Sequence, residues 1–324
     1  MARYLLRRLT AAACVLCVVA VTVFALFELL DSDAAEVALS RYGAGTPTPE
    51  QLAALRAELG LDRPAPIRFL DWAGDVVRGD LGRSLVSGRP VSDVLFDRLG
   101  NSAVLAAVTL ALLIPLAIGL GLLAGSRPGS WLDRVVSAAA PAVESVPPFV
   151  TGVLSVAVVA LSLRLLPAVS LVPRGASVWH SPEVLVLPVA CLLLGAAPHP
   201  IRMVRAQCAQ VIDAPYIRTA RLNGVRGARL LVRHVAPNAL SAAVHPLAGA
   251  VVGLVGGIAV VETLFVYPGV SAEIIGAIVA RDFPFVQSAA VVLAAFGLAV
   301  HLAADLLALW LSPPARAIVT GERS

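Results

Sequence analysis

Residues 216–239 read YIRTARLNGVRGARLLVRHVAPNA, and the strongly apolar runs 184–201 and 235–261 flank this stretch. It contains five arginines and no acidic residue. A basic segment of this kind suits three classes of partner, namely nucleic acid, lipid headgroups and another protein. Composition and membrane topology decide among them.

The composition is that of an integral membrane protein. Of 324 residues, 58% are hydrophobic and only 14% are charged, and the mean hydropathy is +0.86. A soluble domain of this size could not bury so much apolar surface. The chain contains no lysine, which excludes both the lysine of a phosphate-binding P-loop and Schiff-base chemistry. If ATP drives this protein, another chain must therefore bind it.

Six apolar stretches are long enough to cross a bilayer as helices, since a span needs ~20 mainly apolar residues. They are residues 9–27, 101–125, 135–163, 184–201, 235–261 and 286–312. The first could instead be a cleaved signal peptide, but its apolar run is long and no A-x-A site follows closely. The sequence therefore predicts an all-α integral membrane protein with six transmembrane helices.

The distribution of arginine predicts the orientation. With both termini inside, the inner segments hold fourteen arginines and the two short outer loops hold three. Because short inner loops are enriched in basic residues, we expect both termini to be cytoplasmic, in a bacterial inner membrane.

This topology divides the chain into four parts. Residues 1–30 form the N-terminus and first span, and 31–100 form an extracytoplasmic segment. Residues 101–312 form a core of five helices containing the cytoplasmic loop 202–234, and 313–324 form a cytoplasmic tail. Within 31–100, Thr48 is placed to cap a short helix that Gly60 ends.

The sequence has no constellation of residues typical of an enzyme. The five histidines are scattered, and no nucleophile elbow is present. Cys14 and Cys17 lie in an apolar run, which favours small core residues over a redox pair. We therefore expect no catalytic, cofactor or metal site on this chain.

Ionisable residues inside spans usually face a cavity or a partner, because a charge in hydrocarbon is costly. The candidates for a translocation path are Glu144, Pro147, His245 and Glu262. The alternative is a structural hydrogen bond to a neighbouring helix, and His301 and Asp305 could form such an i,i+4 pair. The glycines of GLGLLAG and VVGLVGGIAV are expected to allow close helix packing.

The basic loop predicts two short helices at the cytoplasmic surface. Asp213 and Pro215 form a helix-start signal, and Asn223-Gly224 forms a break. The segment is too short and too close to the membrane for a DNA-reading domain. Its small residues, among them Thr219 and Ala220, suit a surface fitted to another protein.

The spacing Arg218-Thr219-Ala220, three residues, Gly224, nine residues, His234-x-Ala236-Pro237 resembles the EAA loop of binding-protein-dependent ABC import permeases. The chain departs from E-A-A-x-x-x-G and I-x-L-P at Arg218, Thr219, His234 and Ala236. These departures are similar to those of the B-type membrane subunits of dipeptide and oligopeptide permeases. Residues 48–99, 260–287 and 301–316 resemble the same branch.

The resemblance implies a type I ABC importer fold and a permease subunit for peptides, which forms half of the translocation path. The implied partners are a second homologous permease, cytoplasmic ATPase subunits that bind ATP and Mg²⁺, and an extracytoplasmic binding protein. Nucleic acid is not among them. The alternative is a self-sufficient secondary transporter or channel, which would need an ion-coupling site that the sequence does not display.

The resemblance also assigns residues to two surfaces. The residues implied in ATPase coupling are Tyr216, Arg218, Thr219, Ala220, Arg221, Gly224, Arg229, His234 and Pro237. The residues proposed to meet the binding protein are Asp80, Tyr267, Pro268, Arg281 and Asp282.

Overall fold

The structure is a computed structural model that describes residues 2–29, 35, 36, 39, 48–58, 60–171 and 181–311. The described residues are mostly helical, and they contain one isolated β-bridge, between Arg83 and Pro90, but no strand. The predicted C-terminal tail, 313–324, lies outside them. The chain divides into two compact units, with boundaries inside helix α5 (Val91–Gly125), between Pro268 and Gly269, and inside helix α14 (Phe283–Leu311).

One unit consists of Ala2–Gly100 and Gly269–Leu298. Its helices are α1 (Ala2–Glu28), α3 (Pro49–Glu58), α4 (Ala65–Val77), α13 (Val270–Val279) and the first parts of α5 and α14. The predicted cap of α3 is confirmed, because Gln51 N donates to Thr48 Oγ1 (3.3 Å) and Thr48 N donates to Gln51 Oε1 (3.0 Å). Phe24 of α1 packs against Phe69 of α4, with ring centroids 5.4 Å apart.

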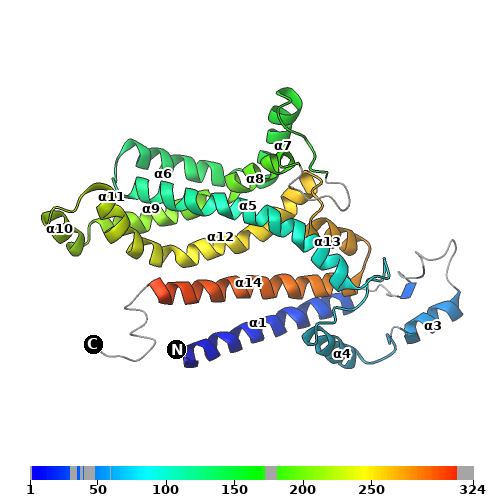
Figure 1. Ribbon diagram of the computed structural model, residues 1–324. Helices are drawn as coiled ribbons and strands as arrows, with labels where there is room; N and C mark the ends of the chain where they lie inside the picture. The colour runs from blue at the N-terminus through cyan, green and yellow to red at the C-terminus, as the bar shows by residue number, and fades with distance from the viewer. Residues whose placement is uncertain are drawn as a thin grey trace. The chain divides into compact units, whose positions relative to one another are not determined.

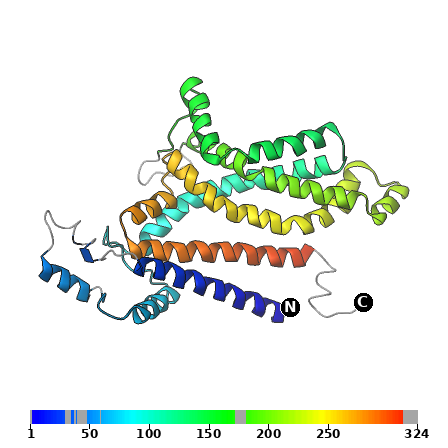
Figure 2. The same cartoon turned by 180° about the vertical axis from the view of Figure 1, so that it is seen from behind.

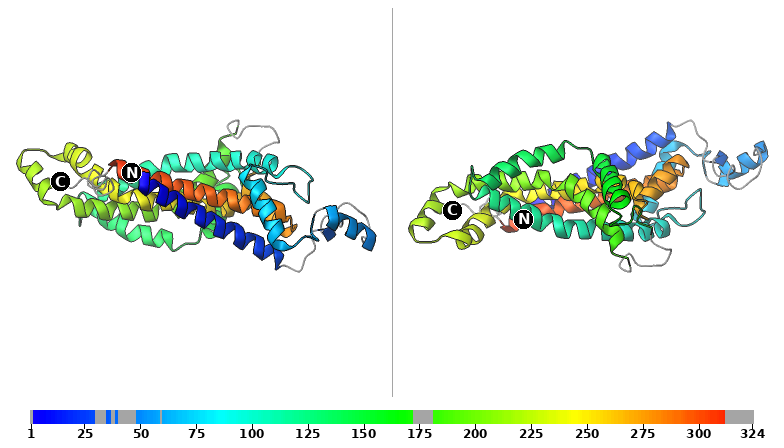
Figure 3. Two further views of the ribbon diagram at one scale, coloured as in Figure 1. Left: turned by 90° about the horizontal axis from the view of Figure 1, so that it is seen from below. Right: turned by 90° about the horizontal axis from the view of Figure 1, so that it is seen from above.

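The other unit contains Asn101–Pro268 and the part of α14 that begins at Ala299. Its remaining helices are α6 (Trp131–Glu144), α7 (Pro148–Ser155), the π-helix η1 (Val156–Ser162), α8 (Glu183–Ala196), α9 (Pro198–Ile212), α10 (Pro215–Leu222), α11 (Gly227–Leu230), the π-helix η3 (Leu231–Val235) and α12 (Ala236–Leu264). α9 packs against both α6 and α12, and α10 and α11 lie beyond its end (Figure 1, and from behind in Figure 2). Both views of Figure 3 keep α10 and α11 at that end of α9.

The predicted spans fall on these helices. Four helices are long and apolar enough to cross a membrane by themselves: Leu6–Glu28, Val91–Gly125, Gly227–Leu264 and Phe283–Leu307. Two bent pairs supply the others, α6 with α7 and η1 at 94°, and α8 with α9 at 45°. The six predicted spans are therefore matched if each bent pair is counted as one span.

One predicted boundary is corrected. The span 135–163 is broken at Pro147 and Pro148, because a residue before proline disfavours helical backbone. Residues 202–212 are not loop but the larger part of α9. Arginines within that stretch have acidic partners on α6, which allows the helix to continue beyond the apolar run.

Glycines of the GLGLLAG run bring α5 against α9, as predicted. A Cβ on Gly121 would lie 2.6 Å from Val204 Cβ, and a Cβ on Gly125 would lie 2.5 Å from the Arg205 carbonyl oxygen. These two glycines are four residues apart, so they share one face of α5. The close contact fixes the spacing between α5 and the helix that leads into α10.

Candidate functional site

The predicted coupling segment follows α9 after a two-residue connection. α9 ends at Ile212 with Asp213 as its C-terminal cap, and α10 begins at Pro215 with Ala214 as its N-terminal cap. The prediction that Asp213 caps α10 was therefore wrong. Pro215 in the first turn sets the start of α10 without a side-chain cap, since its missing N–H needs no partner there.

Two residues of α10 anchor it to the rest of the unit. Ile217 is fully buried and Ala220 is buried, and both belong to a cluster with Ile212 of α9, Leu230 of α11 and Val235 of η3. Ala220, predicted as a contact for the ATPase, thus faces the interior of this chain. The exposed residues of α10 are Pro215, Tyr216, Arg218, Thr219, Arg221 and Leu222.

Gly224 ends α10 in the left-handed conformation, with φ +82°. Gly224 N donates to Arg221 O and Val225 N donates to Ala220 O, both at 3.0 Å, and together these bonds form a Schellman motif. A Cβ on Gly224 would meet no atom within 4 Å. The requirement for glycine is therefore conformational rather than steric.

The remaining predicted coupling residues lie where the chain returns to the membrane. Arg229 is exposed on α11, and His234 is half-buried in η3. Pro237 is exposed and lies in the first turn of α12, where proline is tolerated. Apart from the buried Ala220, the residues predicted to couple to the ATPase are thus exposed or half-buried, and they lie along one continuous segment, Pro215 to Pro237.

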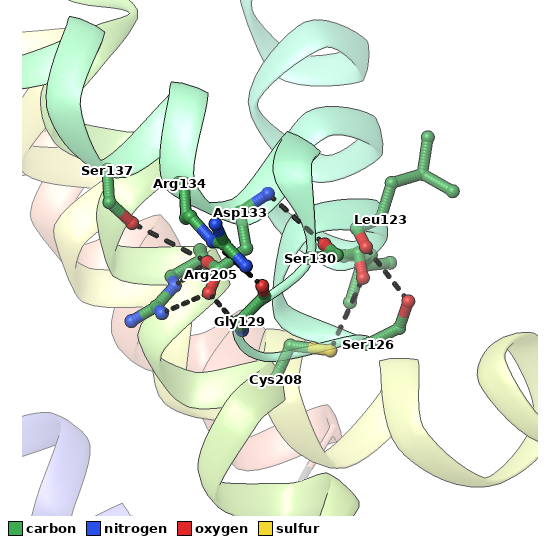
Figure 4. Close-up of polar contacts among 10 residues, drawn as sticks. Leu123, Ser126, Gly129, Ser130, Asp133, Arg134, Ser137, Arg205 and Cys208 are labelled. Carbon is green, nitrogen blue, oxygen red and sulfur yellow. Dashed lines mark hydrogen bonds and ion pairs between the residues drawn. The ribbon is translucent and has the colours of Figure 1, made fainter.

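A bidentate ion pair that the sequence did not reveal lies beside this segment. Arg205 Nε lies 2.6 Å from Asp133 Oδ1, and Arg205 Nη2 lies 2.8 Å from Asp133 Oδ2 (Figure 4). Gly129 N also donates to Asp133 Oδ2 (2.8 Å), and Ser130 Oγ accepts from Asp133 N (3.3 Å). Asp133 is buried, so its charge is matched by a fixed set of donors that joins the start of α6 to α9.

The other end of α6 is also paired with α9. Glu144 Oε2 accepts from Arg202 Nη1 at 2.6 Å, and Glu144 Oε1 lies 3.9 Å from His199 Nδ1. Pro147 follows as the N-terminal cap of α7, at the 94° bend. Glu144 thus forms a hydrogen bond to a neighbouring helix, as expected if its role is structural. Its place on a translocation path remains a prediction.

An apolar cavity of about 420 Å³ lies close to these residues, between α7, α8, α9 and α12. Gly249, Gly253 and Gly257 of α12 line it together with Pro148 and His199. Within VVGLVGGIAV, a Cβ on Gly253 or Gly256 would meet no atom within 4 Å, whereas a Cβ on Gly257 would lie 3.3 Å from Leu192 Cδ2 of α8. The expected close packing is therefore confirmed at Gly257, while Gly253 and Gly256 leave open space.

His245 and Glu262 have different surroundings on α12. His245 is half exposed, and its Nδ1 lies 3.8 Å from Oδ1 of the buried Asp305, which gives Asp305 a partner on another helix. The pair of His301 with Asp305 stays a prediction. Glu262 is fully buried and accepts a hydrogen bond from Ser102 Oγ of α5. The described structure thus supports a structural role for Glu262.

The predicted docking residues differ in how far they are exposed. Tyr267 is buried, donating from its hydroxyl to Asn101 O (2.9 Å), and Pro268 is half-buried, accepting at its carbonyl from Asn101 Nδ2 (2.8 Å). Asp282 is buried and accepts from Ser84 Oγ and from Leu85 N. Asp80 and Arg281 are exposed. Only the last two therefore offer whole side chains to a partner.

Comparison with known proteins matches two parts of the chain to membrane components of binding-protein-dependent transport systems. Residues 117–317 match the family of binding-protein-dependent transport system inner membrane components, and residues 1–106 match the N-terminal family of the same membrane components. A putative peptide transport system permease protein of Brucella abortus is 34% identical over 308 residues, covering 95% of this chain and 96% of the relative.

Two further relatives extend almost end to end. A probable peptide ABC transporter permease protein of Sinorhizobium fredii is 30% identical and covers 97% of this chain and 99% of its own length. The glutathione transport system permease protein GsiC of Pectobacterium atrosepticum is 30% identical, with 98% and 99% covered. The chain therefore belongs to the family of binding-protein-dependent transport system inner membrane components, and it is a permease subunit of the ABC transporter class.

Proposed function

We propose that this chain is the permease subunit of a peptide-importing ABC transporter, and that Pro215 to Pro237 couples it to a separate ATPase. The observation that supports the proposal is that one face of α10 is buried in this chain while the other face is exposed. Ile217 and Ala220 fix the helix to the core formed with α9, α11 and η3, while Tyr216, Arg218, Thr219 and Arg221 remain exposed. A partner that moves α10 would therefore also move the ends of α9 and α12.

The partner that fits this segment is a protein with its own nucleotide site. This lysine-free chain lacks the residue that a P-loop requires, so ATP and Mg²⁺ belong on the ATPase subunits. The proposed assembly contains a second homologous permease subunit and an extracytoplasmic substrate-binding protein. Asp80 and Arg281 are the exposed residues proposed to meet the binding protein.

The proposed translocation path runs beside the cavity between α7, α8, α9 and α12. Pro147, Glu144 and His245 lie next to residues that line this cavity, and Glu262 is the more deeply buried candidate. One permease subunit supplies half of the wall, and the second subunit completes it. Peptides are the proposed cargo, because the Brucella and Sinorhizobium relatives are named as peptide permeases.

Reconstitution into liposomes tests the proposal. We expect peptide uptake to require the second permease, the ATPase, ATP and the binding protein, and to stop when the ATPase is left out. Uptake by this chain alone, driven by an ion gradient, would instead identify the self-sufficient secondary transporter.

A Tyr216→Ala variant tests the assigned segment within the same assay. Tyr216 is exposed and makes no side-chain hydrogen bond within the described residues. The variant should insert and assemble with the second permease but bind the ATPase more weakly. The matched control is Tyr4→Ala, on α1, which should leave ATPase binding unchanged; unchanged ATPase binding by Tyr216→Ala would refute the assignment of this segment.

A further inference from the structure

The short helix α4 packs against the C-terminal end of α1. The two helices belong to the same compact unit, and α4 lies across the end of α1 rather than alongside it (Figure 1). Phe24 of α1 contacts Phe69 and Trp72 of α4, with ring centroids 5.4 and 6.2 Å apart. Glu28, the last residue of α1, forms an ion pair with Arg68 of α4. One side of α4 is therefore occupied by α1.

A second, apolar side of α4 is left uncovered by the residues that the structure describes. Leu70 lies three residues after Ile67, and Val77 lies seven residues after Leu70, so the three side chains share one face of the helix. Ile67 is 42% exposed, Leu70 is 67% exposed and Val77 is 87% exposed. We refer to these three residues as the apolar face of α4.

The charged residues of α4 lie away from this face. At 3.6 residues per turn, Asp75 projects about 140° from Leu70 and about 160° from Val77. Asp75 Oδ1 lies 3.2 Å from Arg78 Nη1, and both side chains are exposed. A helix that is apolar on one exposed side and charged on the other suits the boundary between water and hydrocarbon.

The contacts with α1 set the depth of α4 in the membrane. Residues 9–27 of α1 carry no charge and, at 1.5 Å per residue, extend about 29 Å, which matches the ~30 Å hydrocarbon core. Glu28 thus lies where the hydrocarbon ends, because a carboxylate inside it is costly. Phe24 lies four residues earlier, about 6 Å deeper along the helix axis. α4 contacts both residues, so it lies at the boundary between headgroups and acyl chains.

We propose that α4 is an interfacial helix, whose apolar face inserts between the lipids at the level where α1 leaves the membrane. The apolar faces of such helices are buried about 5–10 Å below the headgroups, which agrees with the depth difference between Phe24 and Glu28. Trp72, which packs on Phe24, belongs to the residue type that is enriched at this level.

Two other kinds of partner fit this face less well. A stable subunit interface buries about 800 Å² on each partner, and three side chains supply only a small part of that area. An anionic partner would find little attraction, since α4 contains one arginine and two aspartates. Insertion should therefore depend on the apolar side chains and not on lipid charge. The inference rests on α1 being a span, and not on the cargo, the ATPase or the orientation of the termini.

Spin labels on the full-length chain in phosphatidylcholine liposomes test the proposal. Single cysteines replace Leu70, Val77 or the matched control Asp75, in a background without the four native cysteines. All three side chains are exposed, so folding should be preserved. Electron paramagnetic resonance compares collisions of each label with oxygen, which concentrates in the bilayer, and with a nickel chelate, which stays in water.

We expect the ratio of oxygen to nickel collisions to be higher for Leu70→Cys and Val77→Cys than for Asp75→Cys. The difference should persist when phosphatidylglycerol is added, because α4 has no excess of positive charge. Equal access of the nickel chelate to all three labels would overturn the proposal, since α4 would then lie in water. Shielding of Leu70→Cys and Val77→Cys from both reagents would also overturn it, because protein would then cover the apolar face.

Discussion

Gly121 and Gly125 determine how closely α5 approaches α9. Each would place a Cβ within 3 Å of α9 atoms, and at Gly125 the nearest of these is a backbone oxygen, which cannot move aside as a flexible side chain can. Gly119 lies on the same helix, yet a Cβ there would meet no atom within 4 Å. The contact therefore depends on which face of α5 carries the glycine, and not on the number of glycines in the run.

Gly125→Ala should separate α5 from α9 and destabilise the chain by about 1–3 kcal/mol. The matched control is Gly119→Ala, which should be neutral or stabilising, since alanine is preferred to glycine inside a helix by roughly 0.5–1 kcal/mol. Thermal unfolding of the two variants in detergent measures the difference. A higher unfolding midpoint for Gly125→Ala than for Gly119→Ala would contradict the packing described here.

The Asp133–Arg205 ion pair could not be predicted from the sequence. Asp133 sits just before an apolar run, where it looks like an ordinary loop carboxylate, and its partner lies 72 residues further along the chain. Charge patterning could not join the two, because only the packing of α6 on α9 brings them together. The glycines of α12 were ambiguous for a related reason, since small residues are equally suited to close packing and to lining a cavity.

The element that was best predicted is α10. Pro215 and Asn223-Gly224 give its limits, because proline is tolerated in a first turn and glycine readily adopts positive φ. The Asp213 cap was wrong because the preceding helix continues beyond its apolar run and takes Asp213 as its own cap. The bend between α6 and α7 was indicated by two prolines, but its angle depends on packing that the sequence does not display.

Gly224→Val tests the turn that ends α10. A residue other than glycine in the left-handed region costs roughly 1–2 kcal/mol, and asparagine is tolerated there more readily. We expect Gly224→Val to weaken binding of the ATPase by about tenfold, as that energy implies, and Gly224→Asn to stay close to the unmodified chain. Binding assays with the assembled transporter compare the two. Equal weakening by valine and asparagine would show that the surface of the turn matters instead of its conformation.

For the whole molecule, the prediction open to the most direct test is its orientation. A single cysteine replacing exposed Ser87, between α1 and α5, should react with a membrane-impermeant maleimide in intact spheroplasts. One replacing exposed Asn223, after α10, should react only when the membrane has been opened. Both cysteines are placed in a background without Cys14, Cys17, Cys191 and Cys208. The opposite labelling pattern would mean that the termini are extracytoplasmic.

The pairing of both ends of α6 with α9 has a mechanical consequence. Asp133 holds Arg205 at the start of α6 and Glu144 holds Arg202 at its end, so α6 cannot slide along α9 unless an ion pair breaks. We therefore expect the two helices to move as one unit. The C-terminal end of α9 continues through two residues into α10, and the C-terminal end of α6 leads to the bend at Pro147 and Pro148. A displacement applied at α10 would therefore be passed along α9 and α6 to that bend.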